Sequence, residues 1–198
     1  MKNYLFILLI CLGCASKKEI VVPKFESKIV SNEKLSCRAI FVDTDKVWLG
    51  MDKGRYGFYD KKKDTLVVKT IQSVSNTTEF RSIAATKDAI FILAVGNPAK
   101  LIKIDKKSLQ ETIVYQEENE KVFYDSMQFV DNLNGFAMGD PTEDCLSFIK
   151  TTDGGNSWEK ISCANFPKVS EGEAAFATSN TNLIVKGKSI FMVSGGKK

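Results

Sequence analysis

The apolar residues of this chain occur in short runs, some alternating with polar residues and some continuous, and turn residues separate the runs. Four similar runs follow one another at a spacing of about 45 residues, a period typical of solenoid or propeller repeats. Each opens on a charged side chain, and the four are Arg38, Arg81, Asp125 and Glu173. The pattern predicts first strands at 38–42, 81–85, 125–129 and 173–177.

A second strand is expected after each first strand, at 47–51, 90–95, 135–138 and 189–193. Turns at Asp60, Asp105 and Asp153 then join a third strand to a fourth, so each unit reads as a four-stranded antiparallel sheet. The sequence predicts an all-β fold in which residues 35–198 form part of a β-propeller of about four blades, the last of them incomplete. A repetitive β-sandwich is the alternative.

The last unit ends at Lys198, where its third strand is expected. Propellers close with several blades, because an open arc leaves strand edges exposed. Two explanations stay open: the chain is part of a larger propeller, or it is an open arc that pairs with another chain.

The segment TTDGGNSW has the residue types of a tight turn between two strands. Its spacing resembles the Asp-box, the S/T-x-D-x-G-x-T-W hairpin of propeller repeats in sialidases, sortilin-type receptors and photosystem II assembly factors. The resemblance gives structural roles to Thr151, Asp153, Gly155, Ser157 and Trp158, with the Trp as a packing anchor. Only the third unit carries the full motif.

The preceding segment, YDSMQFVDNLNGFAMGDP, is similar to the F-x-D-x-x-x-G-x-A-x-G run that precedes the Asp-box in photosystem assembly factors. The third unit therefore resembles a group of exported bacterial propeller lipoproteins, some of which carry an oxidoreductase label. The chain has no GxGxxG after a strand and no haem CxxCH, so the residues themselves give no support to redox chemistry.

The N-terminus, MKNYLFILLICLGC, has one Lys and then an apolar run that is too short to span a bilayer. Its last residues resemble a bacterial lipobox, which implies a signal peptide over 1–14, lipidation of Cys14 and a place in the cell envelope. An ordinary signal peptide cut near Ala15-Ser16 is the alternative. Residues 15–34 are expected to form a linker or an outer strand.

Export allows disulfides, and three cysteines lie beyond Cys14. In an antiparallel hairpin centred near Gly154, residues 145 and 163 lie opposite each other, so we expect a disulfide between Cys145 and Cys163. Two separate buried thiols are the alternative, because a register shift of one residue would turn the side chains to opposite faces. Cys37 is expected to stay a buried thiol.

The composition excludes several kinds of site. The chain has no His, which rules out His-dependent triads, and no CxxC pair, so we expect no metal and no cofactor. The formal net charge is +4, and the Lys residues are spread over turns, so we expect no nucleic-acid partner.

The charged residues that open the four first strands are expected to meet near the propeller axis, at the end opposite the Asp-box turn. Arg38, Arg81, Asp125 and Glu173, with Asp140 at the end of a second strand, are therefore candidates for a ligand-binding funnel. Inter-blade salt bridges or solvated rim charges are the alternative for the same residues.

The favoured function is an exported, lipid-anchored propeller module that binds a protein or a polar small ligand without catalysis. The alternative is a propeller enzyme that uses the axial funnel, either a sialidase-like glycosidase or an oxidoreductase. Sialidases use an arginine triad, and this chain has three arginines, Arg38, Arg55 and Arg81, but lacks the Arg-Ile-Pro motif of that family. No catalytic residue is assigned.

Overall fold

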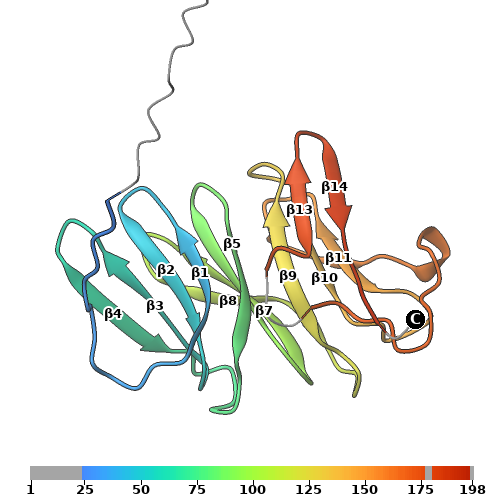
Figure 1. The fold of residues 1–198 in the computed structure, drawn as a ribbon, viewed down its shortest axis with the longest axis horizontal. Coiled ribbons are helices and arrows are strands. Elements are labelled where there is room, and N and C mark those ends of the chain that lie inside the picture. Colours follow the sequence, from blue (N-terminus) through green and yellow to red (C-terminus); the bar gives the residue numbers. More distant parts are fainter. Residues whose placement is uncertain (1–23, 177–179, 197–198) are drawn as a thin grey trace, which may run out of the picture.

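A computed structural model describes residues 24–176 and 180–196 of the chain. Its regular structure is almost entirely β, as predicted, in three four-stranded antiparallel sheets and one two-stranded sheet (Figure 1). The first sheet comprises β1 (Cys37–Val42), β2 (Lys46–Met51), β3 (Arg55–Asp60) and β4 (Thr65–Thr70). The second comprises β5 (Phe80–Ala85), β6 (Ala89–Ala94), β7 (Ala99–Asp105) and β8 (Glu111–Glu117), and the third comprises β9 (Tyr124–Phe129), β10 (Gly135–Gly139), β11 (Ser147–Thr151) and β12 (Glu159–Lys160).

In each four-stranded sheet the strands lie in chain order. The first strands β1, β5 and β9 lie beside one another, and the sheets follow one another along an arc (Figure 1). Apolar clusters fill the space between neighbouring sheets, one between the first two sheets and a second between the second and third. This is the packing of propeller blades, so the prediction of four-stranded blades with an incomplete last unit is confirmed.

The burial of each strand follows from its place in the sheet. The sequence of β6, AIFILA, is continuously apolar, and every one of its residues is buried because the second sheet is covered on both faces. The outermost strand of the same sheet, β8, has the sequence ETIVYQE and is only partly covered.

The fourth unit differs from the prediction. The second strand expected at 189–193 is present as β14 (Ser189–Met192), but it pairs with β13 (Leu183–Lys186) and not with the first strand expected at 173–177. In the described part of that segment only Ala174 takes part in pairing, through an isolated bridge to Gly195. The two strands join through a tight turn at Gly187, whose φ of +62° suits glycine. A local hairpin of β13 and β14 therefore replaces the expected pairing of residues 173–177 with 189–193.

The three predicted turns at Asp60, Asp105 and Asp153 share one hydrogen-bonding pattern. In each, the Asp carboxylate accepts from two backbone N–H groups two to four residues further on. Such Asx bonding closes a turn locally and leaves the strands free to pair. The repeat is therefore visible in turn chemistry as well as in strand spacing.

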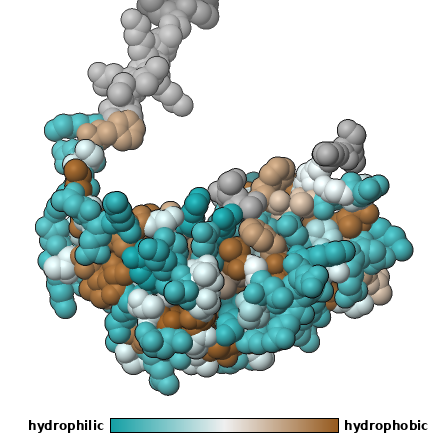
Figure 2. All heavy atoms as spheres, turned by 90° about the horizontal axis from the view of Figure 1, so that it is seen from below, coloured by the Kyte–Doolittle hydropathy of each residue, from teal (hydrophilic) through white to brown (hydrophobic). Residues whose placement is uncertain are grey.

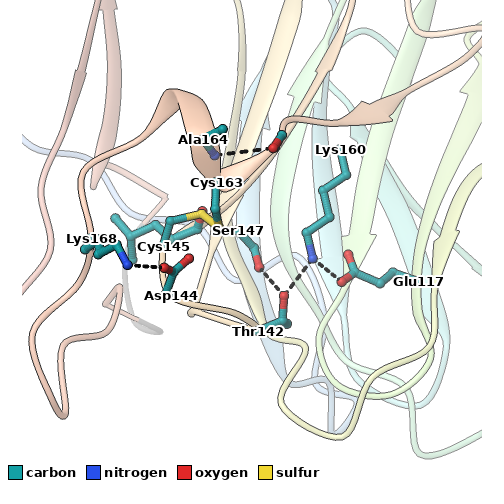
Figure 3. Close-up of a disulfide and its surroundings, with 11 residues drawn as sticks. Glu117, Thr142, Asp144, Cys145, Ser147, Lys160, Cys163, Ala164 and Lys168 are labelled. Atoms are coloured by element: carbon teal, nitrogen blue, oxygen red, sulfur yellow. Dashed lines mark hydrogen bonds and ion pairs between the residues drawn. A yellow bond between two sulfur atoms is a disulfide. The ribbon is translucent and has the colours of Figure 1, made fainter.

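The structure contains the predicted disulfide between Cys145 and Cys163, with the two Cα atoms 5.4 Å apart (Figure 3). The register behind the prediction was wrong by one residue, since Lys150 pairs with Glu159 and Ile149 with Lys160. The bond forms all the same because both cysteines lie outside the paired strands, Cys145 before β11 and Cys163 in the short 3-10 helix η1 (Cys163–Asn165). Irregular backbone there frees the side chains from strict alternation.

Cys37 is a free cysteine, but the expectation that it would be buried was wrong, because its residue is exposed. It is the first residue of β1, where the sheet ends and a shift in the strand register begins. Solvent therefore reaches a position that alternation alone would place in the core.

The predicted signal peptide and the lipidation site Cys14 lie outside the described residues. Residues 24–36 contain no strand, and Lys28 from this segment pairs with Asp64 at the turn between β3 and β4. Within 24–176 and 180–196, no helix is both long and apolar enough to cross a bilayer.

Candidate binding site on the inner strands

The charged residues that open the first strands occupy the same irregularity in three sheets. In β1, Cys37 pairs with Met51 but Ala39 pairs with Gly50, so that Arg38 is an extra residue in the ladder. The same shift falls at Arg81 in β5 and at Asp125 in β9. Each charged residue is therefore the inserted residue of a β-bulge, a feature that re-aims side chains and is common beside functional sites.

Arg81 lies at the bulge of β5 and is held by its neighbours. Its Nε and Nη2 donate to Oε2 of Glu79 at 3.1 and 2.9 Å, and its guanidinium lies over the Phe123 ring, 5.6 Å from the centroid. The cation of this site is therefore already paired with a carboxylate.

Asp125, at the bulge of β9, is 2% exposed. Neither of its carboxylate oxygens has a hydrogen-bond partner in the described part of the chain. Burial and the nearby negative charge of Asp140 raise the pKa of Asp125 to about 7, while Arg81 opposes the rise. A buried carboxyl without donors is rare and marks a candidate functional position.

Asp140 follows β10 and is only half-buried. Gly139 allows this placement, because a Cβ there would lie 2.1 Å from the carbonyl oxygen of Phe123. One carboxylate oxygen of Asp140 accepts from the backbone N–H of Ala175 at 2.9 Å, and burial raises the pKa of the group. The structure thus brings Arg81, Asp125 and Asp140 to one end of the inner strands.

The other two residues predicted for the funnel are Glu173 and Arg38. Glu173 accepts from the Ser194 hydroxyl at 2.5 Å and from the Ser170 N–H at 2.8 Å, and it is two residues from the Ala175 contact to Asp140. Arg38 is exposed, and within the described ranges it forms no ion pair with the other candidates. The ligand-binding role of these residues stays a prediction.

A cleft of about 210 Å³ lies further along the inner strands. It is lined by β1, β5, β9 and Asn180, through residues Ile40, Phe41, Ile83, Ala84, Ala85, Met127, Gln128 and Phe129. The cleft lies next to the charged cluster, because both are built on β5 and β9.

Asn180 occupies the wall of this cleft as a peptide group would. Its Oδ1 accepts from the Met127 N–H at 2.9 Å and from the Ser82 hydroxyl at 2.8 Å, while its Nδ2 donates to the Ile83 and Met127 carbonyls. The sequence pattern gave no signal for Asn180, because the pairing is long-range and involves backbone groups. Backbone groups of β5 and β9 at this cleft are therefore hydrogen-bonded to a side-chain amide.

The 151–158 hairpin has a structural role. Asp153 accepts from the Ser157 hydroxyl at 2.6 Å and from the N–H groups of Asn156 and Ser157, and these bonds lower the pKa of its carboxyl. The Thr151 hydroxyl accepts from the Gly155 N–H at 3.0 Å. Trp158 is buried, with its ring centroid 5.7 Å from that of Phe129 and 6.3 Å from that of Phe91, so it anchors the third sheet to the second.

No group of three or more potential metal ligands occurs among the described residues. The sequence matches no family model and no curated protein.

Solved structures show similar folds. The structure of YCF48 bound to D1 peptide matches with a TM-score of 0.54 at 12% identity, over 71% of this chain and 45% of that one. The structures of U3-55K and of the RRP9 WD40 repeats each match with a TM-score of 0.54 at 10% identity, over 68% of this chain and 41% of theirs. The chain thus spans less than half the length of these neighbours, and the likeness shows one thing, the β-propeller fold.

Proposed function

We propose that this chain is an exported, lipid-anchored β-propeller module that binds a protein partner or a polar ligand in the cleft between its inner strands. The single observation that carries the proposal is the amide of Asn180, which hydrogen-bonds the Met127 backbone N–H and C=O together with the Ile83 carbonyl. Strand edges that hold a side-chain amide in this way also suit the backbone of an extended peptide.

Two further observations support the proposal. The cleft combines apolar walls with polar groups at its edge, which is the usual make-up of a binding site. One structural neighbour, YCF48, was solved with a peptide bound, so a propeller of this general fold can hold a peptide. The export and the lipid anchor rest on the N-terminal sequence.

A pair of variants tests the cleft. Ala85 lines it and is partly exposed, so a photo-crosslinking residue at this position should capture the partner in intact cells. Ala85→Arg should then abolish co-purification of the captured partner, whereas Thr65→Arg, on the exposed outer strand β4, should leave it unchanged. Equal loss of the partner in the two variants, or no loss in either, would contradict binding in the cleft.

A separate assay tests the absence of catalysis. Cleavage of a fluorogenic sialoside by the chain would contradict a non-catalytic role.

A further inference from the structure

The charges at the end of the inner strands do not balance. Arg81 is bonded to Glu79, which leaves Asp125 and Asp140 as two carboxyl groups with no bonded cation in the described part of the chain. Glu173 adds a third carboxylate close by in the chain, and it is bonded to Ser194 and to the Ser170 N–H. The excess charge of this region is therefore negative.

Asp125 and Asp140 differ in exposure in a way that suits a binding site. Asp140 is half-buried and accessible from solvent, whereas Asp125 is buried at the bulge of β9, close enough to interact with the charge of Asp140, and has no donor to either oxygen. A buried carboxylate without a partner destabilises the fold, and a bound cation would remove that cost. Apolar cover also strengthens the attraction between Asp125 and any cation that reaches Asp140.

We infer that Asp125 and Asp140 form a binding site for one cationic side chain, an arginine or lysine of the protein partner, and this inference rests on the proposed function. Asp140 is the partly exposed carboxylate and makes the direct contact, to which a guanidinium or an ammonium group can donate. Asp125, whose oxygens are buried, adds a second negative charge nearby. The neighbouring cleft would hold the backbone of the same partner segment.

Binding of a cation should strengthen as pH rises, because Asp125 has a pKa of about 7 without ligand and must lose its proton to attract the cation. The groups that face it are Asp140 and Arg81, with Glu79 bonded to Arg81. About a tenth of Asp125 is ionised at pH 6 and about nine-tenths at pH 8, so the affinity should rise about tenfold between these values.

The test is an NMR titration of the full chain in detergent micelles with Nα-acetyl-arginine amide, using Nα-acetyl-glutamine amide as a neutral probe. Saturable chemical-shift changes are expected at Arg81, Asp125 and Asp140 with the arginine probe alone. The probe concentration that gives half-saturation should be in the millimolar range and should fall about tenfold from pH 6 to pH 8. Asp125→Asn should remove the pH dependence and weaken binding about tenfold at pH 8. Glu120→Gln, which removes one exposed charge from the loop that leads into β9, should bind as the parent does.

Absence of saturation, equal shifts with the neutral probe, or unchanged binding by Asp125→Asn would overturn the inference. The fold of each variant is checked by its thermal unfolding, and Asp140→Asn gives a second test, because it should also weaken binding. A negative result here would leave the crosslinking experiment at Ala85 unaffected, so failure of the cation site and failure of the proposed function can be told apart.

Discussion

The buried carboxyl group of Asp125 couples the stability of the fold to pH. Its folded-state pKa of about 7 is higher than the usual value of 3.8, chiefly because of burial. Between these two values the folded state holds a proton that the unfolded state has lost, so stability falls as pH rises from about 4 to about 7. The difference in pKa corresponds to about 4 kcal/mol.

We expect Asp125→Asn to stabilise the protein at pH 8 and to change it little at pH 4. The amide cannot ionise, so the cost of a buried charge disappears, and a gain of about 2 kcal/mol at pH 8 allows for the unsatisfied amide. Urea unfolding at the two pH values measures this difference. An equal effect at both values would show that folding does not raise the pKa of Asp125.

Single residues also show what sequence reasoning could reach. Three of the four first strands predicted to begin at charged residues are present, at Arg38, Arg81 and Asp125, but their bulges were not predicted, because an inserted residue appears only when the partner strand is known. Asn180 could not be found from the pattern either, since its partners lie about 50 and 100 residues away and are mainly backbone groups. Long-range hydrogen bonds to backbone leave no signature in residue type.

At the scale of single elements, the 151–158 hairpin depends on a close approach to the neighbouring sheet. Gly155 has a φ of +76°, and a Cβ there would lie 2.3 Å from Cε1 of Phe91. Gly155→Ala should therefore destabilise the protein by about 3 kcal/mol, from backbone strain together with overpacking. Gly187→Ala is the control, because the φ of Gly187 is also positive, at +62°, but nothing lies within 4 Å of the added Cβ. This variant should lose about 1 kcal/mol of unfolding free energy, from backbone strain alone. Similar losses in denaturant unfolding for the two variants would argue against the contact with Phe91.

The disulfide holds the two ends of the same hairpin together. Cys145 and Cys163 are 18 residues apart, and closing a loop of this length restricts the unfolded chain by about 3 kcal/mol. The double variant Cys145→Ser and Cys163→Ser should lower the free energy of unfolding by about that amount, whereas Cys37→Ser should have little effect. A peptide map of non-reduced protein should contain the linked pair, and free alkylation of both cysteines would refute the bond.

The first and second strands of the three complete sheets could be predicted to within one residue, because alternation and turn residues recur in each. In the fourth unit the second strand was also predicted, but the first was not, since the prediction carried the repeat forward and overlooked a local signal: two apolar runs joined by a short turn with Gly187. The hairpin register was wrong by one residue for a related reason. The length of an Asp-bonded turn is set by its hydrogen bonds, which strand patterns do not reveal.

At the scale of the whole molecule, the sheets differ in how well they are covered. The second sheet has an apolar cluster on each face, whereas β1 exposes Ile40 by 61% and Val42 by 66% at the first end of the arc. Apolar surface is visible at this end of the molecule in Figure 2. The pair β13 and β14 also exposes Ile184 and Phe191. Stability should therefore be highest in the middle of the arc.

Hydrogen exchange should follow this gradient. Amide protons of β6, a strand whose residues are all buried, should exchange most slowly, and those of β13 and β14 should exchange much faster. Exchange measured by mass spectrometry on peptides that cover these strands would show the order. Equal protection of β6 and β14 would mean that the arc unfolds as one cooperative unit.

The lipobox-like sequence that ends at Cys14 implies that a lipid anchor holds the molecule on a membrane. Each buried CH₂ of an acyl chain contributes about 0.8 kcal/mol to membrane binding, so a multiply acylated cysteine would hold the whole protein on a membrane. Cys14→Ser should therefore move the protein from the membrane fraction to the soluble fraction. Cys37→Ser removes a thiol from the exposed start of β1 and should leave the protein in the membrane fraction. Equal sedimentation of the Cys14 variant and the parent would contradict a lipid anchor at Cys14.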